Sequence, residues 1–150
     1  MQLIKDNALI SNDWTFISDD AELIAGNISV SLERFLQTKA ELLAGNTLIG
    51  VRLNGSDNVA QLAEALKSIT LIELYFSDFA DGRAFSQAWL LRNRYGYSGE
   101  IRAVGHYCPD QLFYLQRVGV NAFVPLNSED ITVTLAKLKD FSVSYQASVC

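Results

Sequence analysis

Short apolar segments alternate with amphipathic helical patterns along most of this chain, at intervals of roughly twenty to thirty residues. This alternation favours right-handed β-α-β units and a mainly parallel sheet, because consecutive parallel strands need a long crossover between them. The segment 71–76 is almost continuously apolar, as expected of a strand that is covered on both faces. Strands are expected over residues 28–30, 48–53, 71–76, 101–104 and 122–124.

Helix signals lie between and after these strands. Ser31 is suited to capping a first helix, which Gly45 would end, and Asp57 is suited to capping a second. Gly96 would end the third helix, and Ser128 would open the last. The helical patterns cover residues 32–44, 58–66, 82–95, 111–118 and 129–138.

The first residues predict a β-hairpin, because Asp6 and Asn7 tolerate the backbone angles of a tight turn. The acidic segment 13–27 is expected to be a surface connection. A chain of 150 residues suffices for one domain, whereas a complete eight-fold β/α barrel needs about 250. We therefore expect a single α/β domain with an open, mainly parallel five-stranded sheet, flavodoxin-like or half-barrel-like. Its parts are the hairpin and connection (1–27), the βα units (28–140) and a tail (141–150).

The charge balance argues against two classes of partner. A formal net charge of -5 disfavours non-specific binding to nucleic acid and to anionic membranes, so neither partner is expected. No apolar run reaches the eighteen residues that a membrane span needs, and the first residues lack the pattern of a signal peptide. Cys108 and Cys150 lie far apart and form no C-x-x-C pair, so a reduced, cytoplasmic setting is the expectation.

Polar residues gather between residues 77 and 119 where predicted strands meet helices, and ligands bind at such junctions in open α/β sheets. Asp81, Gly82 and Arg83 enter the third helix, with Ser86 one turn further on. Exposed amides and a guanidinium there would suit phosphate, sulfate or a carboxylate. The alternative is structural, with Asp81 as the helix cap and Arg83 paired with a carboxylate. The segment 50–56 lacks the glycine spacing of a nucleotide-binding loop.

His106, the single histidine, follows Gly105 at a predicted strand end, a suitable place for a general acid or base. Asp81 and Asp110 are the other candidates for that role. Cys108 lies near a helix start and close to His106, so a nucleophilic thiol and a passive one are both open. Two ligands do not make a metal site, so no metal is expected. The sequence leaves the cofactor unknown.

The blocks FADGRAFSQAWLLRNRYGYSGEIRAVG, DQLFYLQRVGVNAF and DFSVSYQ carry a family resemblance. Within them, D-G-R-x-x-S-Q-A-x-x-L-R and R-A-V-G…D-Q-L-F are the specific patterns. They resemble a bacterial family of unknown function, the domain of unknown function numbered 934, and the resemblance extends over almost the whole chain. Members are often labelled as oxidoreductases of sulfite reduction, largely because they are encoded beside sulfite reductase and related sulfur-assimilation enzymes.

The resemblance implies site residues as well as a pathway. The family usually has an acidic residue where His106 stands and a basic one where Pro109 stands, which argues against a shared catalytic role for His106 and Cys108. The matching positions are Asp81, Gly82, Arg83, Ser86, Gln87, Arg92, Arg102, Gly105, Asp110 and Gln111. All of them except Arg92 are expected to bind an anion or a partner protein.

These observations leave three functions open. The first is an accessory or assembly protein of assimilatory sulfite reduction that binds an anion or the reductase through the strand-end rim. The second is an oxidoreductase of sulfite reduction with an unidentified cofactor, in which Arg83 clamps the anion and Asp81 or Asp110 is the acid or base. The third is a protein-interaction module outside sulfur metabolism. Sulfite reductase or another sulfur-assimilation enzyme is the expected partner in the first.

Overall fold

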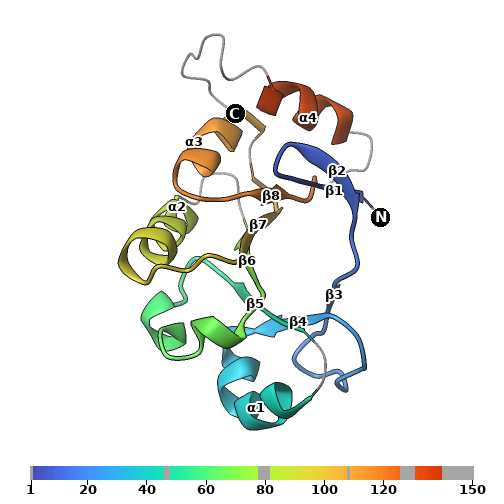
Figure 1. Ribbon diagram of the computed structural model, residues 1–150, viewed down its shortest axis with the longest axis vertical. Coiled ribbons are helices and arrows are strands. Elements are labelled where there is room, and N and C mark those ends of the chain that lie inside the picture. Colours follow the sequence, from blue (N-terminus) through green and yellow to red (C-terminus); the bar gives the residue numbers. More distant parts are fainter. Residues whose placement is uncertain (1, 46–47, 78–81, 108, 126–130, 140–150) are drawn as a thin grey trace.

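The computed structural model describes residues 2–45, 48–77, 82–107, 109–125 and 131–139, which form a curled eight-stranded sheet with helices on its outside (Figure 1). The spatial order of the strands is β2-β1-β8-β7-β6-β5-β4-β3. Neighbours from β3 to β8 pair in parallel, whereas β1 pairs antiparallel with β2 and β8. The strands are β1 (Gln2–Lys5), β2 (Ala8–Ser11), β3 (Thr15–Phe16), β4 (Ile28–Ser31), β5 (Ile49–Leu53), β6 (Leu71–Phe76), β7 (Glu100–Gly105) and β8 (Ala122–Phe123).

The expected α/β class is confirmed, but the expected five-stranded sheet is too small. The five predicted strands are present as β4 to β8, and each lies beside the next one in the chain. This sequential order is that of a half-barrel, since a flavodoxin-like sheet reverses its strand order part of the way along. The hairpin strands β1 and β2 extend the same sheet at one edge. At the other edge, β3 arises from the segment expected to be a surface connection.

Four α-helices are described: α1 (Leu32–Ala44), α2 (Arg83–Trp89), α3 (Leu112–Arg117) and α4 (Ile131–Lys139). Ser31 caps α1 as predicted, because its Oγ accepts from the backbone N–H of Arg34 at 3.2 Å. A π-helical turn, Leu90–Arg94, continues α2, and Gly96 follows it with φ +65°. Ser128 and the tail 141–150 lie outside the described residues. Among the described helices, none is long and apolar enough to cross a membrane.

The predicted second helix is wrong. The chain instead forms two short 3₁₀ segments, Val59–Leu62 and Leu66–Ser68. The Asp57 carbonyl, which a helix capped there would use first, accepts from the Gln87 side chain of α2 at 3.1 Å. The backbone N–H of Gln61 donates to Asn58 O, three residues back, so the turn is tighter than an α-helix.

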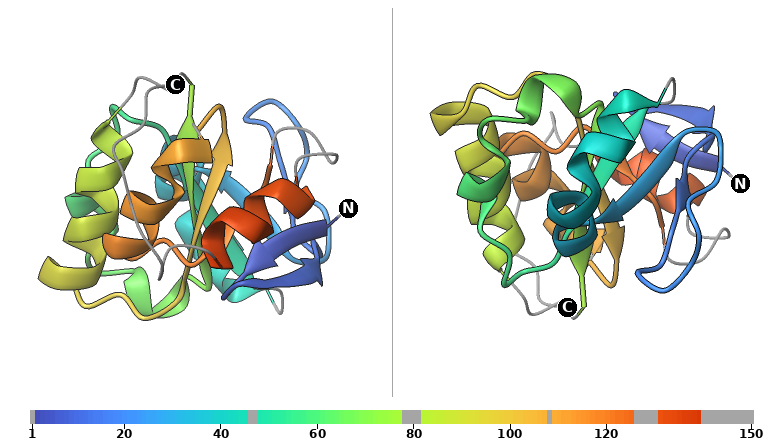
Figure 2. Two further views of the ribbon diagram at one scale, coloured as in Figure 1. Left: turned by 90° about the horizontal axis from the view of Figure 1, so that it is seen from above. Right: turned by 90° about the horizontal axis from the view of Figure 1, so that it is seen from below.

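The two faces of the sheet differ because alternate residues of a strand point to opposite sides. On β6, Ile72, Leu74 and Phe76 face the helices and are all 0% exposed. The Phe76 ring meets Phe85 of α2 edge-on, with 6.4 Å between centroids. We call this side the outer face and the concave side, which carries Glu73, the inner face. Figure 2 shows α2 and α3 on one side of the strands and the N-terminal chain on the other.

Three residues, 12–14, join β2 to β3, although these two strands are the opposite edges of the sheet. Four Cα–Cα steps of about 3.8 Å separate Ser11 from Thr15, so the two edges approach to within about 15 Å. The sheet therefore curls until its edges come near each other. The connection runs along the open side of the curl (Figure 1), and we call residues 12–14 the strap.

Candidate functional site

A row of charged side chains crosses the inner face. The strand register places Arg52 of β5 beside Glu73 of β6, and Glu73 beside Arg102 of β7. Arg52 donates from Nε to Oε1 of Glu73 at 3.2 Å and from Nη2 to Oε2 at 3.4 Å. Glu73 is 4% exposed and Arg102 is 2% exposed. Charged groups are buried this deeply in proteins mainly when they are paired, so the row is a built feature of the sheet.

Arg102 extends the row toward β1. Its Nε and Nη2 both lie 2.6 Å from Oε2 of Glu100, and Oε1 of Glu100 pairs with Lys5 Nζ at 3.2 Å. Nη1 of Arg102 donates to Oδ1 of Asn12 at 3.1 Å, which ties the strap to the sheet. Charges of alternating sign therefore run along Lys5, Glu100, Arg102, Glu73 and Arg52. Three cations and two anions give this row a net charge of +1.

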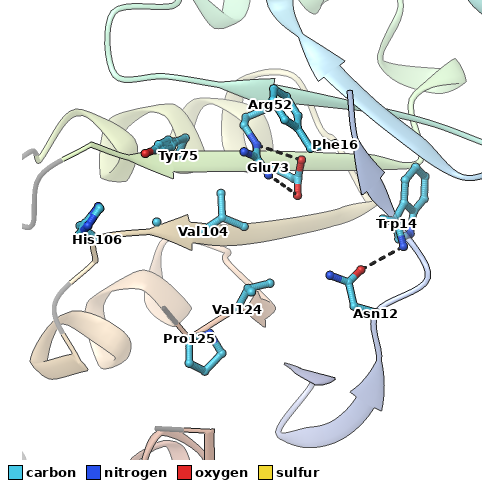
Figure 3. A pocket seen from close by; sticks show the side chains of 11 residues that line it. Asn12, Trp14, Phe16, Arg52, Glu73, Tyr75, Val104, His106, Val124 and Pro125 are labelled. Carbon is cyan, nitrogen blue, oxygen red and sulfur yellow. Dashed lines mark hydrogen bonds and ion pairs between the residues drawn. The ribbon is translucent and has the colours of Figure 1, made fainter. Parts of the chain in front are cut away.

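The strap, the inner face and the strand ends surround a pocket of about 320 Å³, which we call the strap pocket (Figure 3). In Figure 3, Tyr75 and His106 lie at one end, Asn12 and Trp14 lie at the other, and Arg52 lies between. The lining residues come from segments far apart in the sequence: Asn12, Trp14, Phe16, Arg52, Glu73, Tyr75, Val104, Gly105, His106, Val124 and Pro125.

One end of the strap pocket, with Tyr75, His106 and Pro125, lies at the carboxyl ends of β6, β7 and β8, the edge at which β/α barrels hold their active sites. Gly105 ends β7 with φ +88°, a conformation that residues with a side chain rarely adopt. A Cβ at this position would lie 2.5 Å from the Phe76 carbonyl oxygen. The backbone N–H of His106 donates to that same oxygen at 2.8 Å. Glycine at position 105 thus lets the chain leave β7 and bring His106 to the pocket.

Within the described part of the chain, three donor-only nitrogens of lining residues have no hydrogen-bond partner: Arg52 Nη1, Trp14 Nε1 and Asn12 Nδ2. The Asn12 amide is oriented by its oxygen, which accepts from Arg102 and from the Trp14 backbone N–H at 3.0 Å. The Tyr75 hydroxyl and the His106 imidazole also lack a partner among these residues. Both oxygens of Glu73, in contrast, accept from Arg52. The lining residues therefore offer several unpartnered donors to a ligand.

Three residues expected from the sequence lie at or under the strap pocket. Gly105 and His106 line it. Arg102 lies beneath, where Glu100 and Asn12 occupy its guanidinium, so it positions the strap.

The start of α2, where the sequence predicted an anion site, does not line the strap pocket. Asp81 is outside the described residues, and Gly82, Arg83 and Ser86 are exposed without lining the strap pocket. Gln87 is buried, and its Nε2 donates to the carbonyl oxygens of Asn54 at 2.7 Å and Asp57 at 3.1 Å. In this structure Gln87 therefore fixes the loop after β5.

The remaining expected residues are also dispersed. Asp110 accepts from Lys137 of α4 at 3.0 Å, so it ties the start of α3 to the closing helix. Gln111 directly precedes α3 and does not line the strap pocket. Cys108 is outside the described residues. Across the described ranges, no three His, Cys, Asp or Glu side chains gather in a way that could hold a metal ion.

Arg92, which matches the family pattern, holds the end of the π-helical turn. It donates to the carbonyl oxygens of Gly119 at 3.0 Å, Tyr97 at 2.8 Å and Gly99 at 2.7 Å. Burial lowers the pKa of Arg92 from its usual value, and burial raises the pKa of Tyr97. The Tyr97 hydroxyl donates to Ile69 O at 3.0 Å. This cluster joins the outer helices to the start of β7 and has a structural role.

Most residues of the strap pocket were not predicted from the sequence, although charged residues within apolar strands indicated part of it. Arg52, Glu73 and Arg102 each interrupt an otherwise apolar strand. Charged residues at matching places in neighbouring parallel strands indicate a polar stripe on one face. The aromatic residues Trp14 and Phe16 carried no such signal, because the curl that brings them to the strands is a property of the whole sheet.

The fold and the site define an α/β half-barrel with a pocket on its inner face that reaches the carboxyl ends of its strands. The chain belongs to a bacterial protein family of unknown function, DUF934, whose model matches residues 50–150. This match confirms the family resemblance for the part of the chain that contains β5 to β8, and it begins after the strap. No curated protein and no solved structure matches the chain.

Proposed function

We propose that this protein is an accessory protein of assimilatory sulfite reduction that binds an anionic ligand in the strap pocket. One observation carries the anion part: Arg52 presents a guanidinium edge, Nη1, that no described residue uses. Trp14 and Asn12 add further unpartnered donors on the same lining. A ligand rich in acceptors, such as an oxyanion or a carboxylate, is the chemical complement of such a site.

The electrostatics of the inner face support the same proposal. Glu73 is the acidic residue of the lining, and its two oxygens are occupied by Arg52. The row behind the pocket has a net charge of +1, although the whole chain has a net charge of -5. The charges of Arg52 and Glu73 on the lining cancel, so the excess lies on the row beneath the pocket, where it favours an anion over a cation.

The sulfur part of the proposal rests on the family resemblance and on the genes beside which such proteins are encoded. The proposed partner is sulfite reductase, or another sulfur-assimilation enzyme. Gly82, Arg83 and Ser86 are exposed at the start of α2, which follows β6, so they remain the candidates for contact with that partner. The ligand and the partner would then lie at the same end of the sheet.

Deletion of the gene tests this function. The deletion strain should grow slowly with sulfate as the sulfur source and normally with cysteine. Wild-type protein and an Arg94→Gln control, which removes an exposed arginine outside the pocket, should both restore growth. The double variant Arg52→Gln/Glu73→Gln should not. Normal growth of the deletion strain on sulfate would contradict the sulfur part, and full rescue by the double variant would contradict the role of the pocket.

Association with the reductase is tested separately by co-purification from cells grown on sulfate. The tagged wild-type protein should retain the reductase, and Arg83→Ala should retain less of it. Equal recovery with Arg83→Ala would remove the start of α2 from the proposed contact.

A further inference from the structure

The strap pocket is larger than an inorganic oxyanion. Its volume is about 320 Å³, whereas one water occupies about 30 Å³ in the liquid. An anion of four or five heavy atoms would leave room for several waters beside it. The volume lies at the lower end of the range for small-molecule sites, which begins at about 300 Å³.

The walls of the pocket are more apolar than an inorganic anion requires. Trp14, Phe16 and Tyr75 contribute aromatic rings from the strap, β3 and β6. Val104 and Pro125 contribute aliphatic surface at the ends of β7 and β8. Small-molecule sites combine apolar walls with a few placed polar groups in this way. A ligand that fills the pocket must therefore bury an apolar part of its own.

Arg52 presents its guanidinium in a fixed orientation. The Arg52 Cζ lies 3.8 Å from the Phe16 ring centroid and 5.7 Å from the Tyr75 centroid. Its Nε and Nη2 are held by Glu73, so Nη1 is the nitrogen left for a ligand. A planar guanidinium that is stacked and hydrogen bonded loses little freedom when it binds an anion.

We infer that the ligand of the strap pocket is an organic anion with a planar, apolar body. Its carboxylate or sulfonate accepts from Arg52 Nη1, and its body lies against the rings of Trp14 and Phe16. A ligand of about ten heavy atoms fits a pocket of about 320 Å³. This inference rests on the proposed anion binding at the same pocket, and it names the chemical class of that anion.

Three probes separate the charge of the ligand from its body. Benzenesulfonate carries both features, benzenesulfonamide keeps the ring without the charge at pH 7, and sulfate keeps the charge without the ring. Binding is followed by calorimetry and by Trp14 fluorescence in a Trp89→Phe background, because Trp89 lies outside the pocket lining and is 52% exposed. Benzenesulfonate should bind at least tenfold more tightly than either of the other two.

Two variants and one control variant assign the effect to the pocket. Arg52→Gln/Glu73→Gln removes one charge of each sign and should weaken benzenesulfonate binding at least tenfold, whereas Arg94→Gln should leave it unchanged. Phe16→Ala should weaken benzenesulfonate binding about fivefold and sulfate binding less, because it removes a wall for the ring while Glu73 still holds the Arg52 guanidinium. Phe16 is 37% exposed, so this variant should fold.

The outcomes discriminate between the two proposals. If sulfate binds as tightly as benzenesulfonate, the organic body is not recognised and the inference fails, while anion binding stands. If benzenesulfonamide binds as tightly as benzenesulfonate, charge is not recognised and the proposed anion site fails as well. If no probe binds, the inference is overturned, and the growth phenotype remains as the separate test of the sulfur function.

Discussion

The two faces of β6 have different roles in this half-barrel. On the outer face, Ile72, Leu74 and Phe76 are fully buried on the side that carries the helices (Figure 2). On the inner face, Glu73 is paired with Arg52, while Tyr75 lines a pocket. Burial of apolar area is the dominant favourable term in folding, whereas charges and unpartnered donors add little net stability. Stability therefore resides mainly on the outer face, and the groups available to a ligand lie on the inner face.

The largest expected effect breaks the outer face. Leu74→Ala removes buried methyl groups from a residue with 0% exposure and should lower the free energy of unfolding by about 2–5 kcal/mol. Urea denaturation measures the change. Tyr75→Phe, one residue along, should change the stability by less than about 0.5 kcal/mol, because the described residues offer its hydroxyl no partner. Equal losses at the two positions would contradict the division between the faces.

The charged row allows a sharper test on the inner face. Arg52→Gln leaves the Glu73 carboxylate, whose side chain is 6% exposed, without its cationic partner. It should therefore cost about 1–3 kcal/mol. Adding Glu73→Gln should recover most of this loss, because it removes the unpaired charge. A double-mutant cycle in urea measures the coupling, and strictly additive losses would show that the pair contributes nothing to folding.

The free energy of unfolding should also depend on pH, through Tyr97 on the outer side. Burial raises the pKa of Tyr97 above its ordinary value of 10.0, so the folded state holds this proton more tightly than the unfolded state does. The contribution of the Tyr97 hydroxyl to the free energy of unfolding is complete below pH 10. It decreases as the pH rises further, with a limiting slope of about 1.4 kcal/mol per pH unit. Denaturation of wild type and Tyr97→Phe between pH 8 and 11 measures it. The same slope in both proteins would assign the effect to another group.

The sequence predicted helix caps, turns and strands well where adjacent residues determine them. Ser31 caps α1, and the turn at Asp6 and Asn7 has the positive φ values, 51° and 64°, that the hairpin requires. Leu71–Phe76 forms β6 with the predicted bounds. The predicted helix after Asp57 does not form, because Gln87, thirty residues further along the chain, donates to the Asp57 carbonyl. The sequence of residues 57–66 alone does not indicate such a contact.

The candidate site was predicted only in part, for the same physical reason. Gly105 and His106 were placed at a strand end from their own segment, and they do line the strap pocket. Arg52 and Trp14 were missed because the pocket depends on how far the sheet curls. The curl follows from the pairing of strands that are distant in sequence and from the three-residue strap between its edges. Neither feature is encoded in a motif of adjacent residues.

The smallest expected effect concerns the contact that joins the strap to the inner face. Asn12→Ala removes the acceptor shared by Arg102 Nη1 and the Trp14 backbone N–H, and should cost about 1 kcal/mol of folding free energy. Asn12→Asp keeps the acceptor and should cost less. Benzenesulfonate binding should weaken about threefold or more in Asn12→Ala, because Trp14 loses the bond that positions it. If binding is unchanged while stability falls, the strap serves only to close the sheet, and the inner face does not depend on it for ligand binding.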